Sequence, residues 1–168
     1  MKNKIEKELN QITGLPLSEI DRSLDMAVFK FGKMTYGKDK WGNETRAGEF
    51  ALHVQCSWRI LYDNKILIGS SDMYLPRSSW SEEEDFDWEE KGASRFDEQI
   101  EQLPLSSFKV LKSEADQVGG LRIYLSGSAR IEVFPNDSYD EEFWRFFVPG
   151  DLRSHLVVTG AGIEDGDE

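Results

Sequence analysis

Four polar side chains recur at every second position of one short stretch: His53, Gln55, Ser57 and Arg59. Successive residues of a β-strand point to opposite faces, so these four would share one face with neighbours about 7 Å apart. Histidine titrates near neutral pH, so His53 could move protons or donate a hydrogen bond to an anion beside Arg59. We take this face as a candidate binding site. The alternative is a solvated or covered face whose polar groups hydrogen-bond one another.

A predicted hairpin brings Asp72 close to the same face. The sequence Asp63-Asn64-Lys65 is typical of a tight turn, and residues 65–74 would return as an antiparallel partner of the strand. Asp72 would then lie on the return strand. These residues define one functional hypothesis, an enzyme or small-ligand binder that uses a cleft beside His53 and Arg59.

The only cysteine, Cys56, follows His53 by three positions. On a regular strand this odd separation places thiol and imidazole on opposite faces, which argues against a nucleophile–base pair unless a bulge lies between them. Because free cysteine is among the most buried residue types, we expect Cys56 in the core. A single cysteine forms no internal disulfide and, with no apolar leader segment near Met1, favours a cytoplasmic location.

A second candidate site is the acidic segment, residues 82–90, which reads EEEDFDWEE. Seven carboxylates there would steer a basic partner, while Phe86 and Trp88 between Asp85 and Asp87 would provide anchoring area. The alternative is a solvated loop whose aromatic rings pack onto the domain. The segment lacks the glycine and ligand spacing of an EF-hand loop, and the two histidines and one thiol form no zinc motif. We therefore expect no metal and no cofactor.

Composition limits the class of protein further. The 168 residues are enough for one domain, and the net charge of −12 argues against binding to nucleic acid. No stretch has the apolar length of a transmembrane helix. We expect a single domain over residues 1–163 and an acidic mobile tail over residues 164–168.

The elements that position these sites follow from apolar periodicity and turn residues. Phe50, Leu52, Val54, Trp58 and Ile60 alternate with polar residues, which predicts one long strand over residues 50–60 that a bulge or strong coiling must bend. Helices are predicted at residues 5–12 and from the N-cap Ser94 to Pro104, loops at 37–48 and 76–92, a hairpin at 121–133, and further strands at 24–36, 108–111, 143–148 and 156–159. This order predicts an α+β fold with a mainly antiparallel sheet of hairpins, an N-terminal helix and one mid-chain helix.

Several segments resemble a family of uncharacterised bacterial proteins. They are GEFALHVQC (48–56), WR (58–59), GSSDMY (69–74), DW (87–88), RFD (95–97), EVFP (132–135) and EFWR (142–145). That family has no established activity, so the resemblance implies no catalytic residue. Size, charge and aromatic content also resemble immunity proteins of bacterial toxin systems. Our leading hypothesis is a non-enzymatic cytoplasmic protein that binds a basic, toxin-like partner.

Overall fold

The fold is α+β with antiparallel sheets, as predicted. The computed structural model describes residues 1–83, 85–151 and 155–165. The first large sheet has the order β1 (Leu17–Ser23), β2 (Met26–Phe31), β5 (Phe50–Val54), β11 (Glu142–Phe147), β12 (Leu156–Thr159) and β13 (Gly162–Asp165). The second has the order β7 (Lys65–Gly69), β6 (Ser57–Tyr62), β10 (Ala129–Phe134), β9 (Leu121–Leu125) and β8 (Val110–Ala115). β3 (Thr35–Lys38) and β4 (Glu44–Ala47) form a separate two-stranded sheet.

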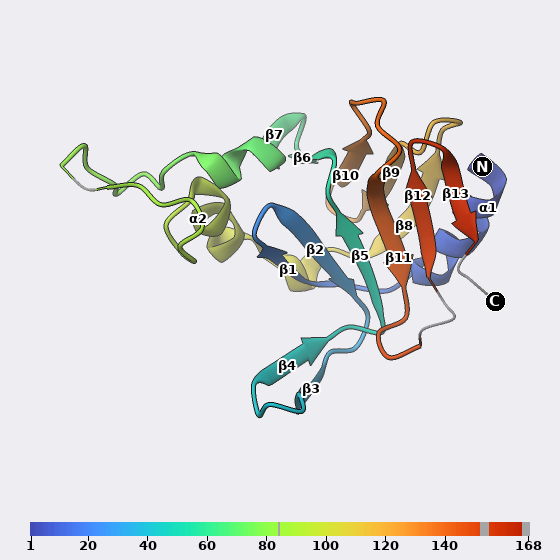
Figure 1. Cartoon of the computed structure of the whole chain (residues 1–168), viewed down its shortest axis with the longest axis horizontal. Helices are drawn as coiled ribbons and strands as arrows, with labels where there is room; N and C mark the ends of the chain where they lie inside the picture. Colours follow the sequence, from blue (N-terminus) through green and yellow to red (C-terminus); the bar gives the residue numbers. More distant parts are fainter. Residues whose placement is uncertain (84, 152–154, 166–168) are drawn as a thin grey trace.

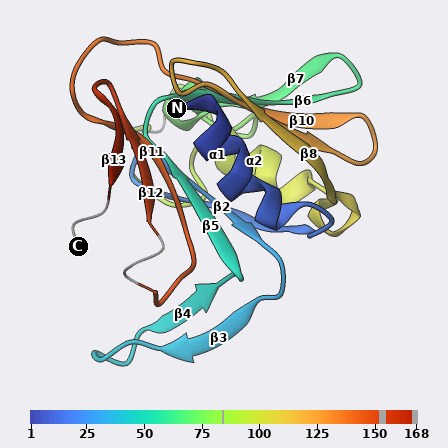
Figure 2. The ribbon, with the colours of Figure 1, turned by 90° about the vertical axis from the view of Figure 1, so that its right-hand side faces the viewer.

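The described residues also form two α-helices and three short 3₁₀ helices. They are α1 (Lys2–Leu9), η1 (Asn10–Ile12), η2 (Ser70–Tyr74), α2 (Arg95–Gln102) and η3 (Leu105–Ser107). Figure 2 shows the two large sheets meeting at an angle, with α1 lying within that angle. Ile5 and Leu9 of α1 are fully buried and belong to one cluster of core residues that includes both sheets. The amphipathic stripe of the N-terminal helix therefore closes the open side of the core.

The predicted single strand over residues 50–60 is wrong, because the chain passes there from one sheet to the other. β5 belongs to the first sheet and β6 to the second. At the transition the backbone N–H groups of Gln55 and Cys56 both donate to the carbonyl of Phe143, over 2.9 and 3.2 Å. Two residues opposite one is the pattern of a β-bulge, which the length of the segment predicted. The apolar alternation persists across the break because both sheets face the same core.

Trp58 of β6 connects the two sheets with α2. Its ring meets Phe29 of β2 edge-on with 5.3 Å between centroids, and Phe96 of α2 edge-on at 5.9 Å. All three side chains are at most 1% exposed. Edge-to-face aromatic contacts favour specific ring orientations, so this trio fixes α2 against the junction of the sheets.

Both predicted hairpin turns and the predicted helix cap are confirmed. Asp63 and Asn64 have φ of 48° and 60°, the left-handed conformation that a two-residue hairpin loop requires. β9 and β10 form the second hairpin. The Oγ atom of Ser94 accepts from the N–H of Asp97, and the Asp97 carboxylate accepts from the N–H of Ser94, so a capping box begins α2.

Several predicted boundaries are wrong. The single strand predicted over residues 24–36 is divided between β2 and the first residues of β3. β1 was not predicted, and the predicted loop at residues 37–48 contains the end of β3 and all of β4. Residues 70–74 form η2 instead of continuing the return strand. Residues 164–165 of the predicted tail belong to β13, which pairs with β12, whereas residues 166–168 lie outside the described part of the chain.

Candidate functional site

The acidic segment lies in a long loop that projects beyond α2, away from the sheets (Figure 1). The loop runs from η2 to α2 and has no helix or strand in its described residues; Glu84 lies outside them. Its two ends are joined by an isolated bridge between Pro76 and Ser94 and by the N–H of Arg95, which donates to the carbonyl of Leu75 over 2.8 Å. These contacts hold the two ends of the loop together, although the loop has no regular secondary structure between them.

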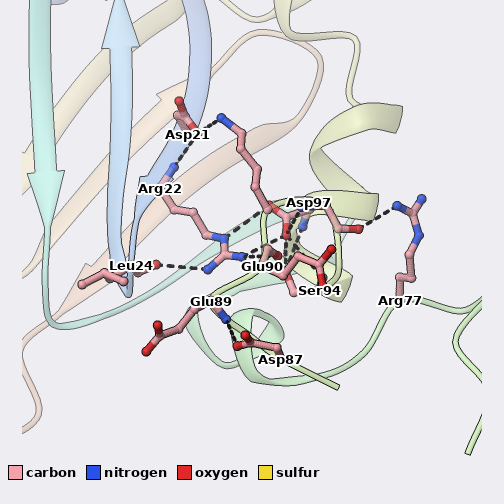
Figure 3. A network of polar contacts seen from close by, with 11 residues as sticks. Asp21, Arg22, Leu24, Arg77, Asp87, Glu89, Glu90, Ser94 and Asp97 are labelled. Atoms are coloured by element: carbon pink, nitrogen blue, oxygen red, sulfur yellow. Dashed lines mark hydrogen bonds and ion pairs between the residues drawn. The ribbon is translucent and has the colours of Figure 1, made fainter. Parts of the chain in front are cut away.

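A buried ion pair holds this base to the first sheet (Figure 3). Arg22 of β1 contacts the Asp97 carboxylate of α2 through Nε at 3.3 Å and Nη2 at 3.1 Å. The same guanidinium donates to the carbonyls of Leu24 and Glu90 at 3.3 and 3.2 Å. Because Glu90 is the last residue of the acidic segment, Arg22 connects that segment directly to β1.

Asp97 has a second role in the same network. Its Oδ2 atom accepts from the Oγ of Ser94 at 2.7 Å and from the N–H of Gly92 at 3.1 Å (Figure 3). Burial alone would raise the pKa of Asp97, but hydrogen bonds from Arg22 and Ser94 outweigh it and lower this pKa. The carboxylate is therefore charged at neutral pH and joins helix cap, loop and strand.

A second carboxylate holds the other end of the loop. Glu98 of α2 is buried and accepts from both the N–H and the Oγ of Ser78. These bonds lower the pKa of Glu98. Arg77 donates to the carbonyl of Gly92 over 2.7 Å, across the neck of the loop. Both ends of the loop are thereby tied to α2 or to each other.

The acidic side chains of the segment are exposed, while its aromatic rings are half-buried. Glu82, Glu83, Asp85, Asp87, Glu89 and Glu90 belong to the exposed residues. Phe86 lies 6.4 Å from Trp80 and Trp88 lies 5.0 Å from Tyr74, measured between ring centroids. Tyr74 itself remains 49% exposed. The rings of Phe86 and Trp88 therefore pack onto neighbouring aromatic side chains and border an acidic surface.

A cavity of about 340 Å³ lies beneath this segment. Arg77, Trp80, Asp85, Phe86 and Asp87 are among the residues that line it. The indole N–H of Trp80 is buried and has no hydrogen-bond partner among the described residues. The aromatic side of the loop therefore borders this cavity.

The predicted polar face at residues 53–59 is divided between the two sheets. His53 lies on β5, where its ring meets Phe147 edge-on at 4.8 Å, and His155 stacks on the same ring at 4.6 Å. Burial, and then the positive charge of Arg145, lower the pKa of His53. His53 is thus neutral at physiological pH and lies against the ring of Phe147, and the negative charge of Glu142 opposes only part of the lowering of its pKa.

Arg59 lies on β6 of the second sheet and is already paired. Its Nε and Nη2 atoms both lie 2.7 Å from Oε2 of Glu132, and Arg130 contacts the other oxygen of that carboxylate at 2.7 Å. Arg59 lines a cavity of about 810 Å³ with parts of α1, β8, β9 and β10. His53, Gln55, Ser57 and Asp72 are not among the residues that line it.

The remaining residues of the predicted face lie in three different parts of the fold. Gln55 is exposed at the bulge, and Ser57 pairs with Phe134 of β10. Asp72 is in η2, where Oδ2 accepts from the N–H of Gly69 over 2.9 Å and caps that helix. The strand-based arrangement of these residues is therefore wrong, and Asp72 has a structural role.

Cys56 is half-buried and packs against the core cluster, and its thiol donates to the carbonyl of Ser57 over 3.8 Å. Burial raises the pKa of this thiol to about 12. A nucleophilic cysteine needs a lowered pKa. Cys56 is therefore not activated as a nucleophile, and it lies at the edge of the core, less buried than predicted.

No group of three or more histidine, cysteine or carboxylate side chains suited to a metal ion occurs in the part of the chain that the structure describes. Within the same residues, no helix is both long and apolar enough to cross a bilayer. The chain matches no protein-family model, no curated protein and no solved structure.

Sequence reasoning missed the residues that hold the acidic segment in place. Arg22 gave no local signal, because its partner Asp97 is 75 positions away. Tyr74 and Trp80 lie just outside the segment and are part of its aromatic side. Both are aromatic residues close in sequence to the acidic run, and that proximity is the signal that could have assigned them to the candidate site.

Proposed function

We propose that this chain is a non-enzymatic binding protein whose acidic segment engages the basic surface of a partner protein. The observation that supports this proposal is a set of exposed carboxylates on a loop. The buried Arg22–Asp97 ion pair attaches the base of that loop to the first sheet. Charge of one sign accelerates encounter with a basic partner, and the rings of Phe86 and Trp88 supply contact area once it arrives. A loop held at both ends loses less conformational entropy on binding than a free one.

The finer form of the proposal is an immunity protein that neutralises a basic bacterial toxin in the cytoplasm. Its support is the small size of the chain, its net charge of −12 and its aromatic content, in which it resembles immunity proteins. A single cysteine with a raised pKa forms no internal disulfide, which is typical of proteins in a reducing compartment. A toxin gene next to the gene for this chain would support this form directly.

The test compares two variants of equal net charge. E83K/D85K reverses two exposed carboxylates of the acidic segment, and E141K/E164K reverses two exposed carboxylates elsewhere. Asp87 is left unchanged because its Oδ1 accepts from the N–H of Glu89 over 2.9 Å. Each tagged protein is used to capture partners from cells of the source organism.

We expect the wild type and E141K/E164K to retain a basic protein that E83K/D85K loses. With that protein purified, the association rate should fall at least about tenfold for E83K/D85K and should decrease with added salt. Equal capture by all three proteins would contradict the proposal, as would a captured partner that is not basic.

A small-ligand site beside Arg59 is the second candidate, since the cavity of about 810 Å³ favours it. Arg122 also lines this cavity and lies between Glu132 and Glu114 in the strand register. Native mass spectrometry of the purified protein tests this function. A bound small molecule that Arg122→Ala removes would support it, and a ligand-free mass would count against it.

A further inference from the structure

The β3–β4 hairpin stands apart from the body of the molecule and projects below it in both views (Figures 1 and 2). Its two strands pair only with each other. Every residue of β3 and the first three residues of β4 are exposed. A lone two-stranded hairpin is only marginally stable in water, so its packing contributes little to the fold. We call residues 33–47 the hairpin arm.

The tip of the hairpin arm is nevertheless well organised. The carboxylate of Asp39 accepts from the N–H groups of Trp41 and Asn43 and from the Nδ2 of Asn43, each over 2.9 Å. The N–H of Asp39 donates to the carbonyl of Asn43 over 2.9 Å. These bonds hold the turn in one shape, so Trp41 is presented from a pre-ordered loop.

The hairpin arm carries two of the most exposed large aromatic side chains in the described residues. Tyr36 is 74% exposed and Trp41 is 75% exposed. The Nζ atom of Lys40 lies 4.3 Å from the centroid of the Trp41 ring. Tryptophan and tyrosine dominate the binding energy of protein interfaces because they bury much area at little entropic cost. The composition is that of a recognition element.

The charge of the hairpin arm is opposite to that of the rest of the chain. It contains four basic residues, Lys33, Lys38, Lys40 and Arg46, and two acidic ones, Asp39 and Glu44, which gives a net charge of +2. Arg46 already pairs with Glu19 of β1 at 3.3 Å, so the three lysines carry the positive charge offered to a partner. With −12 for the whole chain, the remainder carries −14. The arm therefore fits an acidic surface with aromatic contact area. The acidic segment of this same chain has both properties.

We propose that the hairpin arm of one copy docks on the acidic segment of a second copy, and that the reciprocal contact closes a two-fold dimer. Two equivalent contacts of this kind form a closed pair rather than a filament. The inference shares the acidic segment with the proposed function but needs no foreign partner. In such a dimer the arm occupies the surface that a basic partner would use, so partner and second copy compete.

Charge reversal on each side of the contact gives the decisive experiment. K38E/K40E makes the hairpin arm acidic, and E83K/D85K makes the acidic segment less negative. In a dimer of K38E/K40E both contacts are repulsive, and in a dimer of E83K/D85K the attraction at both contacts is weaker. K65E/K109E, with two exposed lysines outside the arm, is the matched control.

Sedimentation velocity over a wide concentration range measures the outcome. We expect a monomer–dimer equilibrium for the wild type and K65E/K109E, and dimerisation at least about tenfold weaker for K38E/K40E and for E83K/D85K. Trp41→Ser should weaken the dimer to a similar extent, whereas Tyr139→Ser, which removes another ring that is 73% exposed, should not. Circular dichroism confirms that each variant is folded.

A wild type that stays monomeric at every concentration would overturn the inference, as would a dimer that K38E/K40E or Trp41→Ser leaves intact. The proposed function is judged separately. K38E/K40E leaves the acidic segment unchanged, so capture of a basic partner by this variant supports the proposed function whatever the state of the dimer.

Discussion

The Nη2 atom of Arg22 lies 3.1 Å from Oδ2 of Asp97, although 75 positions separate the two residues. Their side chains are 5% and 10% exposed. This pair joins an edge strand to the first turn of α2 and, through the carbonyl of Glu90, to the acidic segment. Stability and the geometry of the candidate site therefore depend on the same contact.

We predict that Arg22→Ala destabilises the protein by about 3 kcal/mol, because it leaves the buried Asp97 carboxylate without its cation. Urea unfolding at pH 7 measures the change. Lys91→Ala is the control, since Lys91 is 75% exposed and its contact with Asp21 should contribute less than about 0.5 kcal/mol. Equal losses of unfolding free energy for the two substitutions would show that the buried Arg22–Asp97 pair stabilises the fold no more than an exposed ion pair.

The pH dependence of Asp97 gives a second prediction. Its pKa is lower in the folded protein than its ordinary value of 3.8, so the carboxylate stabilises the fold above that value. This stabilisation is lost as the pH falls from about 4 towards the folded pKa. The difference in unfolding free energy between the wild type and Asp97→Asn should be constant from pH 7 to 5 and smaller at pH 3. A difference that grows on acidification would contradict the assignment.

Caps and tight turns leave signals in the local sequence, whereas contacts between distant residues do not. The Ser94 cap and the Asp63-Asn64 turn depend on residues within a few positions, so sequence alone predicted them. Apolar alternation over residues 50–60 predicted which side chains face the core, but a period of two carries no information about which sheet a strand joins. The alternation therefore predicts one shared face for His53 and Arg59, whereas in the structure they lie on two different sheets.

Elements without an apolar face were also missed. β1 reads LSEIDRS and has few apolar residues to signal a strand, and β3 and β4 are almost entirely exposed. The acidic segment was found from composition alone. Its attachment through Arg22 was not, because a buried ion pair between distant residues leaves no periodic pattern.

Trp58 gives a third prediction, since it contacts both Phe29 and Phe96. Trp58→Ala should cost about 4 kcal/mol of unfolding free energy through the cavity that it creates. The buried indole N–H has no hydrogen-bond partner among the described residues, so Trp58→Phe removes a polar group that gains nothing from burial. We expect a cost below about 2 kcal/mol for Trp58→Phe. Urea unfolding of both variants tests this, and similar costs would mean that the N–H is satisfied in solution.

The thiol of Cys56 gives the fourth prediction, which tests whether this chain can use nucleophilic catalysis. With a pKa of about 12, the folded thiol is almost entirely protonated at pH 8. An ordinary thiol with a pKa near 8.5 is substantially ionised there, so alkylation of the folded protein should be about a thousandfold slower than that of the unfolded chain. Iodoacetamide labelling with and without urea, followed by mass spectrometry, measures both rates at one site, because Cys56 is the only cysteine. If the two rates lay within tenfold of each other, the thiol would be accessible and ionised, and an enzymatic role would have to be considered again.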